Sequence, residues 1–187
     1  MHRLYVTEGI VLGKRGLGEA NTLVSILTRE LGLVRAKAQS ARRERSKLRY
    51  GLEPLTKATF SFVRGKYEWK LTGATVVSRE LIAQAPADRQ AIGRVAKLLL
   101  RLVSGEEGNE ALYKTAAEGL SALARGAPVE TILVLRLLAE LGYLPRTPEL
   151  APFLDADLFS AELAAEAAAS RALLIRSIND SLRATGL

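Results

Sequence analysis

The sequence contains no cysteine and only one histidine among its 187 residues. Without cysteine, the described chain can form no disulfide, thiolate zinc site or cysteine nucleophile. The histidine, His2, lies beside a chain end, where the backbone is often frayed, so a catalytic imidazole is not expected. Asp155 and Asp157 are better interpreted as part of a polar loop than as a Mg²⁺ site. We therefore predict that the protein uses no metal and no other cofactor.

Long apolar runs and catalytic motifs are also missing. No run approaches the roughly 18 apolar residues of a membrane-spanning helix, and residues 1–8 form no apolar signal segment, so we expect a cytoplasmic protein. The P-loop, G-x-S-x-G and H-E-x-x-H patterns do not occur. Residues 13–16, Gly-Lys-Arg-Gly, match the GXXG loop of KH domains, but predicted strands flank them where that loop needs helices. The sequence therefore predicts no enzyme.

Positive charge is concentrated in one half of the chain. The net charge is +7. Residues 1–80 hold 16 Lys and Arg against 7 Asp and Glu, whereas residues 81–187 hold 11 against 13. Such asymmetry indicates nucleic acid or an anionic membrane surface as the partner. A membrane-surface helix would place basic residues opposite an apolar helical stripe. Here they fall on predicted strands and loops, so we favour nucleic acid and expect no membrane contact.

The densest positive segment covers residues 32–49. Seven of its eighteen residues are basic, namely Arg35, Lys37, Arg42, Arg43, Arg45, Lys47 and Arg49. In residues 33–39 small apolar residues alternate with polar ones, which predicts a half-buried strand with a basic outer face. Residues 42–49 then form a loop with five positive charges. Such a loop repels itself unless a polyphosphate lies across it, although a solvated surface loop is the alternative.

The first 77 residues show the period-2 pattern of strands. The predicted strands are residues 4–13, 21–28, 33–39, 55–63 and 67–77. The expected inward-facing residues are Val6, Ile10 and Leu12 in the first strand, Val34, Ala36 and Ala38 in the third, and Ala58, Phe60 and Phe62 in the fourth. Lys14 to Ala20 is glycine-rich and predicts a turn, and Gly32 suits a hairpin position with positive φ. Five short strands predict a small closed barrel, with a five-stranded OB-fold as the leading candidate.

From about residue 79 the apolar period changes to that of helices. We predict helices at residues 88–104, 109–124, 128–141 and 166–184, with Leu173 and Leu174 among the apolar positions of the last. Asn109 is a candidate cap, and Gly126 and Gly142 are candidate stops. Residues 145–158 contain three prolines and should be irregular. The predicted fold class is α+β in two parts, an OB-fold domain at residues 1–80 and an all-α helical domain at residues 81–187.

Aromatic residues are few, which draws attention to those near basic ones. Tyr67 and Trp69 are two apart in the last predicted strand, beside Lys66 and Lys70, so they would share one face. Bases stack on such side chains in single-strand binding grooves. The alternative for Trp69 is a place in the barrel core. Tyr50, beside the basic loop, is a further candidate for stacking, and its alternative is packing against a neighbouring leucine.

Several segments occur in the order found in a known family. They are Glu8-Gly-Ile-Val-Leu-Gly-Lys-Arg-Gly-Leu-Gly-Glu-Ala-Asn21, Leu27-Thr-Arg-Glu-Leu-Gly32, Ala41-Arg-Arg-Glu-Arg-Ser-Lys-Leu48 and Leu52-Glu-Pro-Leu55. Together they resemble the N-terminal OB domain of the bacterial recombination mediator family RecO, and residues 135–145 resemble a helix of its second domain. Many members carry a four-cysteine zinc module after that helix. Here the cysteine-free segment 145–158 takes its place, and the chain is shorter than usual.

The resemblance implies a non-enzymatic function and a nucleoid-associated location. Proteins of this family bind single- and double-stranded DNA, anneal complementary strands, and with RecR help RecA load onto DNA coated by single-stranded-DNA-binding protein. The DNA-binding residues we expect are Lys14, Arg15, Arg35, Lys37, Arg42, Arg43, Arg45, Lys47, Arg49, Tyr50, Lys66, Trp69 and Lys70. Arg94, Lys97 and Arg101 are candidates for binding the C-terminal tail of single-stranded-DNA-binding protein, or else form a solvated helix face. Alternatives for the function are another OB-fold module, which binds RNA, and an enzyme of unrecognised type.

Overall fold

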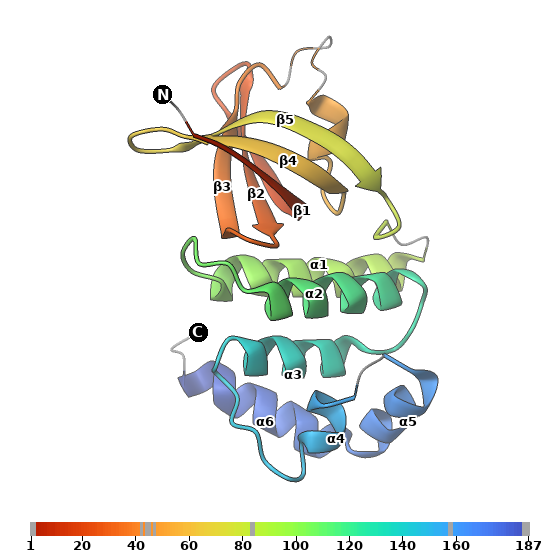
Figure 1. Cartoon of the computed structure of the whole chain (residues 1–187). Helices are drawn as coiled ribbons and strands as arrows, with labels where there is room; N and C mark the ends of the chain where they lie inside the picture. The colour runs from red at the N-terminus through yellow and green to blue at the C-terminus, as the bar shows by residue number, and fades with distance from the viewer. Residues whose placement is uncertain are drawn as a thin grey trace. The chain divides into compact units, whose positions relative to one another are not determined.

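The structure is a computed structural model that describes residues 3–41, 43, 46, 48–82, 85–156 and 159–184. Within these residues, five β-strands precede six α-helices (Figure 1). The predicted α+β class with an N-terminal OB-fold is confirmed. The chain divides into two compact units, Met1–Ile82 with Ala96–Tyr113, and Ala83–Val95 with Lys114–Leu187. The domain boundary at residue 80 stays a prediction, although the barrel unit also takes in residues 96–113.

The strands close into a barrel in the order β1-β2-β3-β5-β4. Their bounds are β1 Leu4–Leu17, β2 Asn21–Thr28, β3 Gly32–Ala38, β4 Lys57–Arg64 and β5 Trp69–Ser78. All pairs are antiparallel except β3 with β5. The long β1 pairs with β4 through Leu4–Ile10 and with β2 through Gly9–Leu17. Among the described strands, the last third of β1 therefore has a neighbour on one side only.

The barrel interior is filled by the apolar half of each alternating strand. Its buried residues include Val11, Val24, Ile26, Val34, Ala36, Ala38, Ala58, Phe60, Phe62, Trp69 and Leu71. The inward faces predicted for the third and fourth strands are confirmed. The inward face predicted for the first strand is wrong: Val6 is 60% exposed, and Ile10 and Leu12 are buried outside the barrel core, which Val11 enters instead. On this part of β1 the inward phase falls on Tyr5, which packs against the core.

Two turns differ from the predicted bounds. β1 continues to Leu17 across the predicted glycine-rich turn, because residues 13–17 pair with β2. Gly18, with φ of 65°, lies at the turn itself. β5 begins at Trp69 rather than at Tyr67, and the Gly65 N–H donates to the Glu68 carbonyl at 2.9 Å in the turn before it. The positive φ predicted for Gly32 is confirmed at 66°.

The first three predicted helices are confirmed, each within a few residues. The helices are α1 Pro86–Leu102, α2 Glu110–Ala124, α3 Glu130–Glu140, α4 Ala151–Leu154, α5 Ala161–Ala169 and α6 Arg171–Ala184. The Asn109 side chain caps α2 by accepting from the Leu112 N–H at 2.9 Å. Gly126 and Gly142, with φ of 84° and 76°, follow the ends of α2 and α3. These glycines adopt the left-handed conformation common just after a helix.

The last part of the chain is more divided than predicted. Residues 145–158, expected to be irregular, contain the short helix α4. The single helix predicted at 166–184 is instead two helices that meet at Ser170, and Ser160 caps the first by accepting from the Leu163 N–H at 3.1 Å. Leu174 is fully buried, but Leu173 is half-exposed. α3 packs against α4, α5 and α6. Among the described residues, none of the helices is both long and apolar enough to span a bilayer.

Candidate nucleic-acid interface

The register of the barrel aligns three of the predicted DNA-binding cations. Arg15 on β1 lies opposite Leu23 on β2, which lies opposite Lys37 on β3. Lys37 in turn lies opposite Lys70 on β5. Paired residues point to the same side of a sheet, and the adjacent row, with Val24, lies in the core, so this row faces outward. We call Arg15, Lys37 and Lys70 the basic row; its strands lie about 5 Å apart.

The charges of the basic row are largely uncompensated. Arg15 and Lys70 are exposed, and neither makes an ion pair with any residue that the structure describes. Lys37 makes only a long ion pair, 3.7 Å from its Nζ to Glu68. Like charges directly opposite each other in a sheet are destabilising. The Lys37–Lys70 pair is therefore unfavourable, is only weakly offset by Glu68, and would be relieved by an anion lying across it.

Beside the basic row runs a groove with a partly apolar lining. It measures about 360 Å³ and is lined by Gly13, Lys14, Arg15, Leu23, Ser25, Arg35 and Leu100. Arg35 lies two residues before Lys37 and so on the same outer face, and its Nη2 donates to the Leu100 carbonyl at 3.3 Å. Arginine planes and apolar side chains can contact the faces of nucleic-acid bases. The groove and the basic row together offer surfaces for both bases and phosphates.

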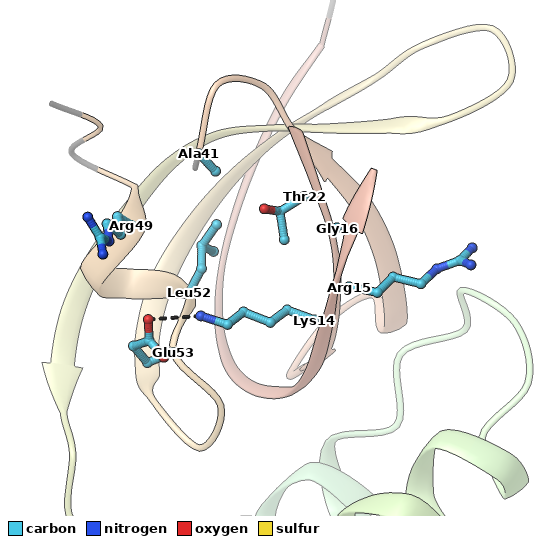
Figure 2. Close-up of a pocket in the computed structure, with 8 residues that line it drawn as sticks. All are labelled: Lys14, Arg15, Gly16, Thr22, Ala41, Arg49, Leu52 and Glu53. Atoms are coloured by element: carbon cyan, nitrogen blue, oxygen red, sulfur yellow. Dashed lines mark hydrogen bonds and ion pairs between the residues drawn. The ribbon is translucent and has the colours of Figure 1, made fainter. Parts of the chain in front are cut away.

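A second cleft lies on the other side of β1. It measures about 460 Å³ and separates β1 from the 3₁₀-helix η1, Arg49–Leu52. Figure 2 shows Lys14 reaching across this cleft, while the neighbouring Arg15 points away from it. The Lys14 Nζ forms an ion pair with Glu53 at 2.8 Å. We call this space the β1–η1 cleft.

The remaining predicted residues lie in several places. Arg43 is exposed, whereas Arg42, Arg45 and Lys47 lie outside the described residues. Tyr50 is exposed on η1, and its carbonyl accepts a hydrogen bond from Arg79. Lys66 lies in the turn between β4 and β5, with its Nζ 5.0 Å from the centre of the Tyr67 ring. Tyr67 is 87% exposed and thus open to stacking, a position that the strand pattern did not reveal.

Trp69 occupies the core rather than the surface. It is 4% exposed and makes edge-on contacts with the rings of Tyr5 and Phe62, with centroids 5.0 and 6.1 Å away. Its indole N–H donates to the Glu106 carboxylate at 2.7 Å. A base has no free face of this ring to stack on, so the structure favours the core alternative and we remove Trp69 from the candidate interface.

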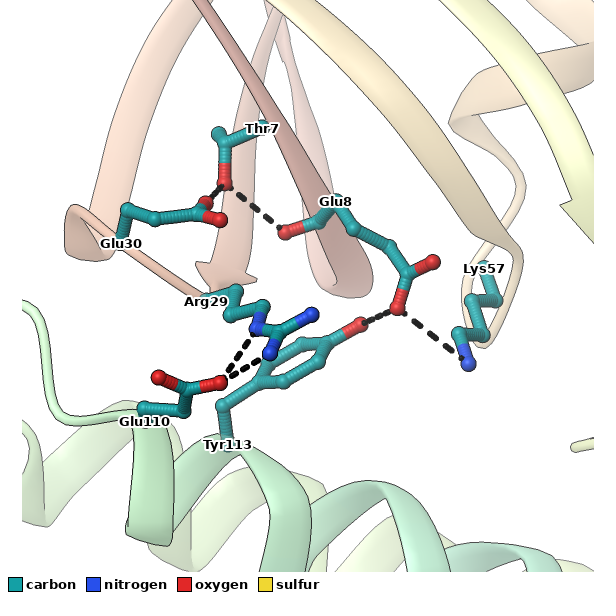
Figure 3. Close-up of polar contacts among 7 residues, drawn as sticks. All are labelled: Thr7, Glu8, Arg29, Glu30, Lys57, Glu110 and Tyr113. Atoms are coloured by element: carbon teal, nitrogen blue, oxygen red, sulfur yellow. Dashed lines mark hydrogen bonds and ion pairs between the residues drawn. The ribbon is translucent and has the colours of Figure 1, made fainter.

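The structure also contains a polar network that the sequence did not predict (Figure 3). The Tyr113 hydroxyl donates to the Glu8 carboxylate at 2.9 Å, and Lys57 lies 3.3 Å from the same oxygen. Arg29 Nε donates to Glu110 at 2.7 Å. Burial, and then the hydrogen bond to Glu8, raises the pKa of the Tyr113 phenol well above its usual value. The two residues of the Tyr113–Glu8 contact are 105 positions apart in the sequence, and those of the Arg29–Glu110 contact are 81 positions apart. Local sequence patterns cannot reveal contacts over such separations.

Residues 106–108, just before α2, pack closely against the barrel through their backbone. A Cβ on Gly108 would lie 2.2 Å from the Glu30 carbonyl oxygen, and one on Gly32 would lie 2.5 Å from the Glu107 carbonyl oxygen. Glu106 adds an ion pair to Arg64 at 2.7 Å. Several carboxylates of the barrel unit are therefore paired with cations outside the basic row, which leaves the row as an unbalanced positive surface.

The residues predicted to bind a partner tail all lie on α1. Arg94 donates from both Nε and Nη2 to the Glu130 carboxylate, at 2.7 Å each. This bidentate ion pair engages the charge of Arg94, which the sequence did not predict. Lys97 and Arg101 are exposed and carry no ion pair among the described residues.

The strand order β1-β2-β3-β5-β4 and the parallel β3–β5 closure define an OB-fold domain. Residues 1–78 match the family described as "Recombination protein O N terminal". The chain is 32% identical over 151 residues to the DNA repair protein RecO of Dehalococcoides mccartyi strain CBDB1. The aligned region covers 79% of this chain and 60% of that protein. It is 34% identical over 146 residues to RecO of Heliobacterium modesticaldum, which covers 76% and 53%.

A shorter match is closer in sequence. The chain is 48% identical over 63 residues to RecO of Thermobifida fusca, which covers 34% of this chain and 26% of that protein. The chain belongs to the RecO family of DNA repair proteins. It spans 60% and 53% of the length of the first two relatives. The resemblance noted in the sequence is confirmed.

Proposed function

We propose that the chain is a non-enzymatic DNA-binding protein of recombinational repair that holds a DNA strand against the outer face of its barrel. One observation carries this proposal: Arg15, Lys37 and Lys70, from three different strands, fall in a single register row. A chain of phosphates laid across the strands would meet these cations in succession. Phosphate neutralisation supplies most of the sequence-independent affinity for nucleic acid.

The groove beside the row supports a preference for a single strand. With the phosphates on the basic row, bases turned toward Leu23 and Arg35 would contact apolar surface and a guanidinium plane. A double-stranded region keeps its bases stacked inside and offers only phosphates to the same surface. Both forms should bind, and the single strand should use more of the site.

Membership in the RecO family extends the proposal to annealing and to protein partners. Annealing requires the mutual repulsion of two phosphate backbones to be reduced, and a basic barrel can do this without a catalytic group. We further propose that the chain acts with RecR to help RecA load onto DNA coated by single-stranded-DNA-binding protein. For the tail of the latter, exposed Lys97 and Arg101 are the remaining candidates, since Arg94 is engaged by Glu130.

A charge-matched pair of variants tests the DNA site. Arg15→Ala/Lys37→Ala/Lys70→Ala removes the basic row, and Arg171→Ala/Arg176→Ala/Arg183→Ala removes three exposed arginines from α6. Fluorescence anisotropy with a labelled single strand should show affinity lowered between about threefold and a hundredfold in the first variant, because exposed charge contacts contribute about 0.2–1 kcal/mol each. The α6 variant should bind like the wild type. Equal losses in both would refute the placement.

An RNA competitor tests the alternative ligand. Unlabelled DNA and RNA strands of equal length and sequence should be titrated against the bound labelled strand. Our proposal predicts that DNA competes at least as well as RNA. Displacement at a much lower concentration of RNA would favour an RNA-binding OB-fold module instead.

A further inference from the structure

Adjacent residues on β1 serve opposite sides of the strand. Lys14 and Arg15 point apart, as neighbours in a strand do, so Lys14 belongs to the β1–η1 cleft and Arg15 to the basic row (Figure 2). Both residues line both hollows, because β1 is the wall between them. The predicted DNA-binding residues are therefore divided between two surfaces.

The β1–η1 cleft is open because this part of β1 has a strand partner on one side only among the described residues. β4 pairs with β1 only as far as Ile10. Beyond that point η1 takes the place of a neighbouring strand and stands across the cleft from residues 14–16. Thr22, Ala41 and Leu52 also line the cleft, so its surface combines small, apolar and basic side chains.

The two cations of this cleft, Lys14 and Arg49, are available to bind an anion. Arg49 is exposed and makes no ion pair among the described residues. Lys14 is paired with Glu53, but both side chains are partly exposed, at 33% and 47%. An exposed ion pair contributes at most about 1 kcal/mol, so an entering phosphate can replace Glu53 as the partner of Lys14. The sequence that leads into η1, residues 42–49, is itself strongly basic.

We propose that the β1–η1 cleft is a second site for a single nucleic-acid strand, separate from the basic row, in which Lys14 and Arg49 bind phosphate and Glu53 competes with it. This inference rests on the proposed function, since it takes the first strand to lie on the basic row. One barrel then holds two strands on opposite sides of β1. Annealing between them needs no second copy of the protein.

The number of oligonucleotides that one full-length chain binds tests the inference. The probe is a thymidine oligonucleotide of about 12 nucleotides, within the length that one OB-fold covers. Its two differently labelled forms cannot pair with each other. Native mass spectrometry should detect one chain with two oligonucleotides, and energy transfer between the labels should report the same complex in solution.

Variants assign each strand to its site. Lys14→Ala/Arg49→Ala should leave one bound oligonucleotide, and removal of the basic row should also leave one. Glu53→Gln should strengthen the binding of the second strand by about twofold to fivefold, since it removes a competing carboxylate from an exposed pair. Glu19→Gln, an exposed carboxylate in the turn after β1, is the matched control and should change it little.

The outcomes separate this inference from the proposed function. If a saturated chain carries one oligonucleotide that is lost with the basic row, the proposed function stands and the second site is refuted. If Lys14→Ala/Arg49→Ala weakens that single strand as much as loss of the basic row does, the two surfaces form one continuous site and the inference is again wrong. If no oligonucleotide binds, both proposals fail.

Discussion

Replacing Glu106 should destabilise the barrel unit from a residue that lies outside the barrel sequence. The Glu106 carboxylate accepts from the indole N–H of Trp69 and pairs with Arg64, each at 2.7 Å. Because Trp69 is buried, Glu106→Ala leaves its N–H without an acceptor, which costs about 1–3 kcal/mol. The exposed pair with Arg64 adds less than about 1 kcal/mol. We expect a loss of about 1–4 kcal/mol in unfolding free energy.

Trp69 is itself the reporter for this experiment, because it is the only tryptophan in the chain. Urea unfolding followed by its fluorescence gives the stability of the unit that contains it. Glu106→Gln keeps an acceptor oxygen and should lose only about half as much. Glu107→Ala removes the exposed neighbouring carboxylate and should lie within about 0.5 kcal/mol of the wild type. If Glu106→Ala is no less stable than Glu107→Ala, the contact does not hold this segment to the barrel.

Three further predictions concern pH, glycines and the basic loop. The raised pKa of Tyr113 means that the folded chain keeps the phenol proton after the unfolded chain loses its own near pH 10. The stability that this group contributes is complete below about pH 10 and is lost as the pH rises. The unfolding free energy should therefore fall more steeply from pH 10 to about pH 11 in the wild type than in Tyr113→Phe, by up to about 1.4 kcal/mol. Parallel slopes of the two proteins would contradict this prediction. Gly93→Ala, in an open position on α1, should raise stability by about 0.5–1 kcal/mol. Gly108→Ala should lower stability, because the added Cβ would meet the Glu30 carbonyl. Thermal melts that rank the two variants in reverse would refute the close approach of Gly108 to Glu30. Arg42→Ala/Arg43→Ala/Arg45→Ala should make the slope of log K against log salt for a single strand shallower by about one to two units, and an unaltered slope would mean that the loop meets no phosphate.

Much of the barrel could be predicted because its strands carry their own alternation. Phe60 and Phe62, two apart in β4, both fill the core, and the alternating segment before Gln39 orients Arg35 and Lys37 outward. Local period 2 is sufficient for such residues. It failed on β1, because the apolar residues Val6, Ile10 and Leu12 do not lie in the inward phase of the strand, which Val11 occupies.

The basic row could not be predicted, although each of its residues was. Its alignment depends on pairing between strands, and the register of β1 with β2 shifts at a bulge between Val11 and Gly13. A shift of one residue moves every following side chain to the opposite face. The bulge therefore decides that Arg15 faces outward and Lys14 faces the cleft. Gly13 lies at the bulge, and glycine within a strand often marks one, but it does not by itself specify the register that follows.

The contacts that residues 96–113 make with the barrel also could not be predicted from the sequence. Tyr113 reads as one more residue of a helix, and its bond to Glu8 spans 105 positions. Trp69 was ambiguous for a related reason, because an aromatic residue beside lysines fits a stacking surface and a barrel core equally well. The acceptor that decides for the core, Glu106, comes from this distant segment.

The salt dependence of single-strand binding tests the central claim most directly. Each phosphate contact contributes about 0.7 to the slope of log K against log salt for a single strand. The variant without Arg15, Lys37 and Lys70 should therefore show a slope shallower than the wild type by about two units, while the α6 variant of equal charge keeps the wild-type slope. Identical slopes in all three proteins would mean that the basic row touches no phosphate, and the account of this barrel as a DNA-binding surface would be wrong.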